Sequence, residues 1–369
     1  MAAAIYSLGA KGIQVDLDLD VGHLARVEIE RDGRRTAPFH RAPWADDDGP
    51  VPGSQDAPHL ARLSGDFFCA PFAASDIEPA PAHGWPANAA WTPIGSNAVD
   101  AGVCARFALT RSVMGASVVK ELTVRDGHPF LYQRHILEGG SGAVPVANHA
   151  MFSLPSGGRM FFSPKRWGET PAVPLEADPK RGRSVFLYPA VTADLRRLPL
   201  AAGGTADLSH YPVDEMHEDL VMLVEAEGSK LGWSAILRPE QGDLALTLKD
   251  PRQLPATILW FSNGGRSYAP WNGRHRNVLG VEDGCVYSIA GHRASIEPNP
   301  LTREGIPTAI NLDPDGQVEV RHVVGAIPVP AWLTDVSDVS LDSGSITITA
   351  RSGATISLPF DSAFLSGEN

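Results

Sequence analysis

The chain has 369 residues, of which 43% are hydrophobic, and its formal net charge of −12 disfavours nucleic acids and anionic membrane surfaces as partners. No apolar run reaches the ~18 uncharged residues that span a bilayer, so we do not expect a membrane protein. Three cysteines far apart in sequence, Cys69, Cys104 and Cys285, lack the spacing of a metal site and fit a reducing, cytoplasmic compartment.

The N-terminal segment, MAAAIYSLGAKGIQVDLDLD, has no basic region and only a short apolar stretch. A secretory signal needs both, so we expect no export signal here. The next segment, GHLARVEIERDGRR, contains Asp32-Gly33, and Asp126-Gly127 follows later in the chain. Such pairs tolerate positive φ and close tight hairpins, so both predict turns between neighbouring strands.

Most of the remaining chain has the pattern of short strands. Runs rich in β-branched residues indicate strands at 118–124, 130–137, 244–248, 345–350 and 355–358. No segment keeps a 3.6-residue period over three turns, and 36 Gly and 31 Pro would interrupt long helices. We predict an all-β fold, a large twisted antiparallel β-sandwich with under about 15% helix. Residues 1–369 are expected to form one domain, because 44–58 and 71–93 have the character of surface loops rather than linkers.

The loop HGWPANAAW brings His83 close in sequence to Trp85 and Trp91. Indole rings stack on the C–H faces of sugars, and histidine forms hydrogen bonds with hydroxyls, so this loop is a candidate sugar site. The alternative is that both indoles fill the core beneath the loop. The local sequence favours neither interpretation.

His149 lies in an apolar strand-like run, NHAMFSLP, after a Gly-rich turn. A single histidine in such a strand is more often a core residue with satisfied hydrogen bonds than a catalytic one. Catalysis by His149 is therefore the alternative interpretation at this point.

The segment HYPVDEMHEDLVML is rich in acidic residues and histidines, the residue types that bind metals. Spacing of this kind recurs by chance in acidic loops, and no cysteine joins the group. We expect no metal, and a metal site built on His210, Asp214 and His217 is the alternative.

The connection WFSNGGRSYAPWNGRHR lies between two apolar strands and holds more aromatic and hydrogen-bonding groups than a plain turn needs. These groups are Arg266, Tyr268, Trp271, Arg274 and His275. In the following VLGVEDG, Asp283 is the usual turn former before a glycine. Glu282 is interpreted as a carboxylate at a strand end that faces a cleft.

Taken in order, these segments resemble the galactose mutarotase-like superfamily, which includes aldose 1-epimerases and hexose-6-phosphate mutarotases. KELTVRDGHPFLYQRHILEG resembles the paired strands before the family's second histidine, NHAMFSLP its Asn-His-x-x-Phe signature, and HGWPANAAW its His-Gly with a Trp eight residues on. EDLVML and VLGVEDG are similar to the segments that carry the family's aspartate and glutamate. The resemblance covers about residues 20–310 and implies a sandwich whose concave cleft holds His83, His149, Asp219 and Glu282.

The chain departs from the family pattern in places. Ala87 stands where the phosphosugar branch has an arginine, four residues after its histidine, so phosphate recognition is not implied. RLSGDFFCAPF loosely resembles that branch's Arg-Gly-Gly-x-Pro stretch and makes Arg62 a candidate binding residue. After Glu282 the chain continues Asp-Gly-Cys instead of the proline-containing sequence of epimerases, so the sugar and the reaction can differ from galactose mutarotation.

The resemblance implies an isomerase that interconverts sugar anomers and needs no metal or other cofactor. A base takes the proton of the anomeric hydroxyl, and an acid protonates the ring oxygen as the C1–O5 bond opens. An ionised Glu282 would be the base and a protonated His149 the acid. The substrate-binding residues implied are His83, Asp219, Arg62, Trp271 and Trp85.

Two other classes of protein remain open. A lyase or glycoside-cleaving enzyme, metal-dependent through the acidic segment 210–219, could use the same scaffold. A sugar-binding protein without turnover would need aromatic and amide groups but no acid–base pair. In every case the expected partner is a small sugar or sugar derivative, and the sequence makes no prediction of the oligomeric state.

Overall fold

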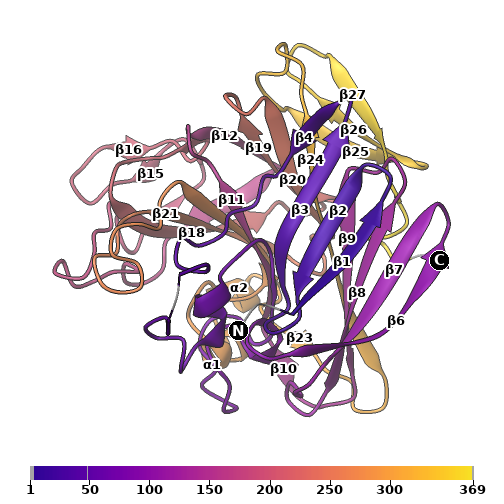
Figure 1. Cartoon of the computed structure of the whole chain (residues 1–369). Helices are drawn as coiled ribbons and strands as arrows, with labels where there is room; N and C mark the ends of the chain where they lie inside the picture. The colour runs from indigo at the N-terminus through magenta and orange to yellow at the C-terminus, as the bar shows by residue number, and fades with distance from the viewer. Residues whose placement is uncertain (1–3, 48, 368–369) are drawn as a thin grey trace.

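The protein, described by a computed structural model over residues 4–47 and 49–367, is built almost entirely of antiparallel sheets (Figure 1). Strands take up about 47% of the chain and helices about 5%, which confirms the predicted all-β sandwich and its low helix content. The short helical segments are α1 (His292–Ile296), α2 (Pro300–Arg303) and the 3-10 turns η1 (Pro58–Arg62) and η2 (Trp85–Ala87). That the whole chain forms one domain stays a prediction.

Two large sheets face each other. The first has seven strands, in the order β14 (Val191–Thr192), β13 (Lys165–Glu169), β18 (His217–Glu225), β21 (Ala256–Asn263), β22 (Val278–Cys285), β11 (Val146–Ser153) and β5 (Phe68–Cys69). The second has nine strands, in the order β17 (His210–Tyr211), β12 (Gly158–Phe162), β19 (Gly232–Arg238), β20 (Asp243–Lys249), β24 (Gln317–Pro328), β9 (Phe130–Glu138), β8 (Ser117–Arg125), β7 (Gly102–Leu109) and β6 (Trp91–Val99).

Four smaller sheets complete the architecture. The N-terminal sheet comprises β1 (Ile5–Ala10), β2 (Ile13–Asp18), β3 (His23–Arg31) and β4 (Arg34–Thr36), and the C-terminal sheet comprises β25 (Asp338–Asp342), β26 (Ser345–Thr349) and β27 (Thr355–Pro359). Two strand pairs remain: β10 (Ala143–Val144) with β23 (Ile310–Asn311), and β15 (Leu198–Pro199) with β16 (Thr205–Ala206). Asp32-Gly33 joins β3 to β4 and Asp126-Gly127 joins β8 to β9, both glycines with positive φ, which confirms the two predicted turns.

The alternation of side chains along a strand explains how the seven-stranded sheet serves two layers. On β22, Leu279 and Val281 point into the core between the two large sheets, whereas Val278 and Glu282 point to the opposite face. Loops cover that opposite face, which we call the loop-covered face. Because both faces are covered, β18, β21 and β22 are buried along their whole length.

The small sheets extend the core on either side of the sandwich. The N-terminal sheet contributes Val15, Leu17 and Val27 to the core between the large sheets. The C-terminal sheet, yellow at the upper right of Figure 1, packs Ile346 and Ile348 against the outer face of the nine-stranded sheet. The nine-stranded sheet is therefore covered on its outer face over only part of its width.

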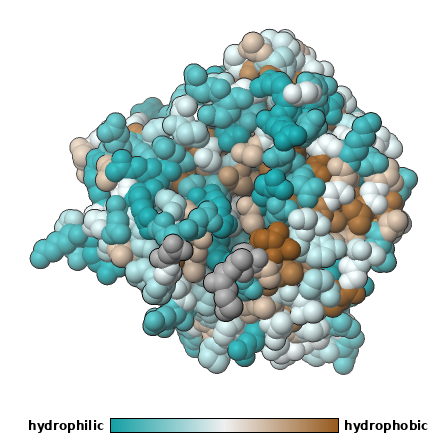
Figure 2. All heavy atoms as spheres, viewed as in Figure 1, coloured by the Kyte–Doolittle hydropathy of each residue, from teal (hydrophilic) through white to brown (hydrophobic). Residues whose placement is uncertain are grey.

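The visible surface of the protein mixes hydrophilic and hydrophobic side chains (Figure 2). Hydrophilic side chains cover most of the face seen in Figure 2. Across the described ranges 4–47 and 49–367, no helix combines the length and the apolar character that crossing a membrane requires.

Candidate active site

A cavity of about 360 Å³ opens on the loop-covered face of the seven-stranded sheet. Four adjacent strands build its floor, with His149 on β11, Glu282 on β22, Trp260 on β21 and Leu220 on β18. His149 lies directly opposite Glu282, and Trp260 directly opposite Leu220. The volume falls within the ~300–1,000 Å³ of small-molecule sites. The sheet thus presents a floor that is polar at one end and apolar at the other.

Loops supply the walls of the cavity. Most wall residues are apolar, among them Leu60, Leu63, Phe67, Phe72, Leu175, Trp271 and Ile289. The polar wall residues are His59, His83, Arg266 and Tyr268. In a mostly apolar cavity, a ligand is oriented by its hydrogen bonds to the few polar side chains, which here are these four.

His149 and Glu282 form the chemical centre of the floor. The Nε2 atom of His149 lies 3.2 Å from Oε1 of Glu282, and both side chains are almost fully buried. Burial raises the pKa of Glu282 well above its usual range and lowers the pKa of His149 to about 3. Both shifts favour an uncharged pair with the proton on the carboxyl, contrary to the ionised Glu282 and protonated His149 expected from the sequence.

Aromatic neighbours pack against the ring of His149. It stacks on Phe67 with a centroid distance of 4.5 Å, and the other histidine stacked on Phe67, His23, lies 4.2 Å from it. The backbone N–H of His149 also donates to the carbonyl of Phe67 at 2.9 Å. The backbone pairing and the stacking place the imidazole beside Glu282.

His83 reaches the same cavity from the loop between β5 and η2. It has a positive φ of 67° and is followed by Gly84, whose Cβ would lie only 1.9 Å from the carbonyl oxygen of Ala70. This close approach explains the glycine after the histidine. The ring of His83 lies edge-on to His149 with a centroid distance of 5.3 Å.

Trp271 lines the cavity beside Trp260, with ring centroids 6.1 Å apart. The guanidinium of Arg266 lies 4.4 Å from the Trp271 ring centroid. Nε of Arg266 donates to Glu176 at 2.8 Å, and Nη1 lies 3.6 Å from Glu218. Two carboxylates thus neutralise this guanidinium, which gives the cavity little attraction for an anion.

Asp219 does not reach the cavity, contrary to the expectation. Odd-numbered residues of β18 face the nine-stranded sheet, as Val221 does. The Asp219 carboxylate accepts hydrogen bonds from the backbone N–H groups of Val185 and Phe186 and from the Tyr188 hydroxyl. It holds a loop in place instead of binding a ligand. The preceding Glu218 is on the cavity side, where it accepts a hydrogen bond from Trp260 Nε1 at 2.6 Å.

Two further candidates also lie outside the cavity. Arg62 pairs with Asp18 at 3.1 Å and with Asp20 at 2.8 Å, so its guanidinium ties η1 to the N-terminal sheet. The ring of Trp85 lies 4.9 Å from the guanidinium of Arg111. Neither residue is among those that line the cavity.

The acidic segment does not gather its histidines and carboxylates around one point. Asp214 pairs with Arg183 at 2.6 Å, His217 with Asp219 at 2.7 Å, and His210 with Asp207 at 3.4 Å. Within the part of the chain that the structure describes, no group of three or more His, Cys, Asp or Glu side chains could hold a metal ion.

One polar cavity residue had no signal in the sequence. His59 lies in η1, and its Nδ1 is 2.9 Å from Oδ1 of Asn88. No motif surrounds it, and its place in the site depends on the η1 turn and on Asn88, which belongs to the loop HGWPANAAW. The burial of Asn88 and its contact with His59 are tertiary features that the sequence does not reveal.

Comparisons with known proteins agree on the fold. No protein-family model matches the sequence, and no curated protein matches it. Among solved structures, a "putative aldose 1-epimerase" from Klebsiella pneumoniae subsp. pneumoniae aligns with a TM-score of 0.57 and 15% identity over 87% of this chain and 78% of that one. A second protein of that description, from Escherichia coli K12, aligns with a TM-score of 0.56 and 14% identity over 89% of this chain and 100% of that one. A galactose mutarotase-like protein from Clostridium acetobutylicum aligns with a TM-score of 0.51 and 12% identity over 87% of this chain and 94% of that one. The chain has a galactose mutarotase-like fold.

Proposed function

We propose that this protein, with its galactose mutarotase-like fold, is an aldose 1-epimerase-like isomerase that interconverts the anomers of a sugar. The observation that carries the proposal is the buried contact between His149 Nε2 and Glu282 Oε1 at 3.2 Å on the cavity floor. Two titratable groups held together in a cavity, with pKa values shifted strongly by burial, are typical of proton-transfer sites.

In the uncharged pair, the carboxyl of Glu282 carries a proton that it can exchange with His149. When it moves from Glu282 to His149, the pair becomes a carboxylate base and an imidazolium acid. The carboxylate then takes the proton of the anomeric hydroxyl while the imidazolium protonates the ring oxygen, and the C1–O5 bond opens to the aldehyde. After rotation about C1–C2, the reverse steps close the ring as the other anomer and return the pair to its first state.

The remaining cavity residues support substrate binding. His83 presents an imidazole edge to the same space, and Trp271 offers an aromatic face to the C–H groups of a pyranose. Asp219, Arg62 and Trp85 have no part in this proposal. The reaction needs only proton transfers, so it requires no metal or redox cofactor. A small sugar as partner and a cytoplasmic location belong to the proposal, and three unpaired cysteines support a reducing compartment.

Glycoside cleavage is disfavoured because it needs two free carboxyl groups on either side of the bond. The second carboxylate near the floor, Glu218, is already bonded to Trp260 and Ser262. A binding protein without turnover is the second candidate, since an uncharged His149–Glu282 pair and apolar walls also suit a passive site.

The deciding experiment measures anomer exchange over a panel of free sugars by NMR exchange spectroscopy and polarimetry. The proposal expects at least one sugar whose exchange is accelerated by the wild-type protein and not by Glu282→Gln. Binding of a sugar without acceleration by either protein would favour the passive site.

A further inference from the structure

His59 presents a hydrogen-bond acceptor to the cavity. Asn88 Nδ2 donates to the carbonyls of Ala82 at 2.8 Å and Gly84 at 2.7 Å, so the Asn88 Oδ1 atom must face His59. This oxygen accepts from the backbone N–H of His59 and from its Nδ1, both at 2.9 Å. Nδ1 of His59 therefore carries the ring hydrogen, and Nε2 carries a lone pair. The ring lines the cavity.

His83, by contrast, presents a hydrogen-bond donor to the cavity. Its Nδ1 lies 3.5 Å from Sγ of Cys69, and Cys69 is fully buried. Burial raises the pKa of the Cys69 thiol well above its usual range, so the thiol keeps its hydrogen near neutral pH. We assign the S–H group as the donor to Nδ1, which places the ring hydrogen on Nε2. His83 lines the same cavity and offers it a donor.

The two imidazoles face one part of the cavity. Their ring centroids are 5.2 Å apart and the ring planes are nearly perpendicular, at 84°. Over residues 4–47 and 49–367, neither Nε2 atom has a hydrogen-bond partner of its own. An acceptor and a donor are thus held side by side by other groups, and both are available to a ligand.

We propose that His59 and His83 together bind one hydroxyl group of the substrate, with His59 Nε2 as acceptor and His83 Nε2–H as donor. The identification of the ligand as a sugar rests on the proposed function. A hydroxyl donates and accepts at a single oxygen, whereas an ammonium only donates and a carboxylate, an ether oxygen or fluorine only accepts.

The charge state of the pair agrees with a neutral ligand group. Burial lowers the pKa of His59 to about 4 and holds the pKa of His83 well below its usual range. Both rings are uncharged at neutral pH and give no electrostatic attraction to a phosphate. This subsite therefore selects an unmodified hydroxyl over a phosphorylated or alkylated one.

Asn88 is the positioning residue of the subsite. Its oxygen fixes the tautomer of His59, and its two N–H donors hold the carbonyls on either side of His83. One amide therefore fixes the tautomer of His59 and holds the turn that carries His83. Asn88→Asp keeps the acceptor for His59 but loses both donors, so it should leave the His59 tautomer unchanged and disturb the His83 turn.

The first test needs no ligand. Long-range ¹⁵N–¹H NMR spectra of the imidazole rings report which nitrogen carries hydrogen. We expect the Nδ1–H tautomer for His59 and the Nε2–H tautomer for His83, with loss of the fixed His83 tautomer in Cys69→Ala. An Nε2–H tautomer at His59 in the wild-type protein would overturn the inference, whatever reaction the protein catalyses.

The second test couples a residue to one position on the sugar. Binding of the best panel sugar and of its monodeoxyfluoro analogues is followed by tryptophan fluorescence, since Trp260 and Trp271 line the cavity. At one ring position, fluorine should weaken binding by about 5–10-fold in the wild type and by less than about 2-fold in His59→Phe. His128→Phe, which changes a histidine outside the cavity that bonds to Tyr132, serves as control and should keep the wild-type difference.

The outcomes separate the two claims. Equal fluorine penalties in wild type and His59→Phe at every position would overturn the hydroxyl pair even if anomer exchange is fast. A position-specific loss without any anomer exchange would support the pair and reject the isomerase. If His59→Phe does not fold, His59→Gln replaces it. If no panel sugar binds, the proposed function fails, and the tautomer measurement decides the pair alone.

Discussion

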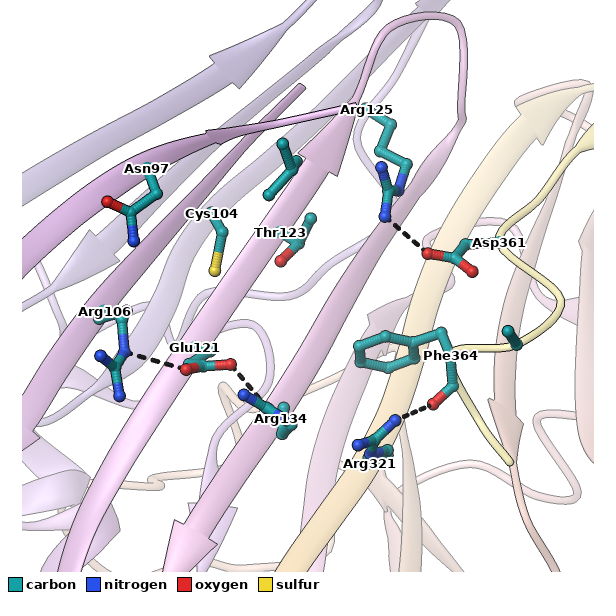
Figure 3. A pocket seen from close by; sticks show the side chains of 12 residues that line it. Asn97, Cys104, Arg106, Glu121, Thr123, Arg125, Arg134, Arg321, Asp361 and Phe364 are labelled. Carbon is teal, nitrogen blue, oxygen red and sulfur yellow. Dashed lines mark hydrogen bonds and ion pairs between the residues drawn. The ribbon is translucent and has the colours of Figure 1, made fainter. Parts of the chain in front are cut away.

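The protein has a second, larger hollow that contrasts with the candidate active site. This groove, of about 470 Å³, lies between the outer face of the nine-stranded sheet and the chain after β27, and Figure 3 shows its lining. Its charged residues form a ladder across β7, β8, β9 and β24. Arg106 pairs with Glu121 at 2.9 Å, Glu121 with Arg134 at 2.7 Å, and Arg134 with Glu319 at 3.2 Å.

Two arginines of the nine-stranded sheet hold the segment after β27 in place. Arg125 pairs with Asp361 at 2.7 Å, and Arg321 donates to the Phe364 carbonyl at 2.8 Å (Figure 3). Each arginine of the groove is thus matched by a nearby carboxylate or carbonyl. In the cavity on the other sheet, by contrast, His59 and His83 keep free nitrogens and Glu282 is buried with a shifted pKa. A contacting pair of titratable groups whose pKa values burial shifts strongly, His149 and Glu282, rather than volume, distinguishes the candidate site.

The largest expected effect lies in the cavity. Glu282→Gln keeps the shape of the side chain but removes the base, so turnover on the best sugar should fall by about 10²–10⁴ while affinity changes little. His149→Asn should do comparable damage. Near-normal anomer exchange by Glu282→Gln, measured by NMR, would show that this carboxylate is not the base. The cavity would then lack the catalytic role that separates it from the groove.

A buried charge network between the two regions should make stability depend on pH. His322 on β24 lies 3.0 Å from Asp283 and 3.7 Å from Asp66, fully buried. Burial alone would lower its pKa, but the hydrogen bonds and charges of the two carboxylates outweigh burial and raise it to about 9. The folded form therefore binds a proton that the unfolded chain releases near pH 6.5.

The direction of this pH dependence follows from the linkage between proton binding and folding. This contribution to the free energy of unfolding is fully present below about pH 6.5 and is lost as the pH rises through 9, by up to about 3 kcal/mol. Urea unfolding at pH 6 and pH 9.5 measures it, with His322→Gln expected to flatten the dependence. An equal dependence in wild type and variant would show that the imidazolium does not hold the sheets together.

Trp271→Ala tests the binding wall of the cavity. Loss of the aromatic face should weaken sugar binding by about 1–3 kcal/mol with a smaller effect on turnover of bound sugar. Fluorescence or calorimetric titration gives the affinity. Unchanged affinity would mean that the sugar does not stack on this ring.

The smallest effect is expected in the groove. Glu121 bridges Arg106 and Arg134, but the arginines are partly exposed, so water already screens the pairs. Glu121→Gln should lower the free energy of unfolding by no more than about 1 kcal/mol and leave anomer exchange unchanged. A loss of exchange in this variant would give the groove a function that its paired charges do not suggest.

The sequence predicted the fold more fully than the site. Alternating runs and Asp-Gly turns are local signals, and the strands and hairpins that they predict are present in the structure. The resemblance implies Asp219, but strand parity places Asp219 toward the nine-stranded sheet and Glu218 on the cavity side, and the sequence does not give that parity. Arg62 is neutralised by Asp18 at the end of β2 and by Asp20 in the turn that follows, both far away in sequence. His59 enters the site only through Asn88, a tertiary contact that no local pattern signals.

The strand order of the nine-stranded sheet also has a consequence for how the chain folds as it is made. β24 (Gln317–Pro328) lies between β20 and β9, so it joins the two halves of that sheet. A ribosome must therefore release more than 300 residues before the halves can connect. Until then β9 and β20 each have an unpaired edge. Such long-range pairing slows folding, and unpaired strand edges are prone to aggregation while they wait for their partner.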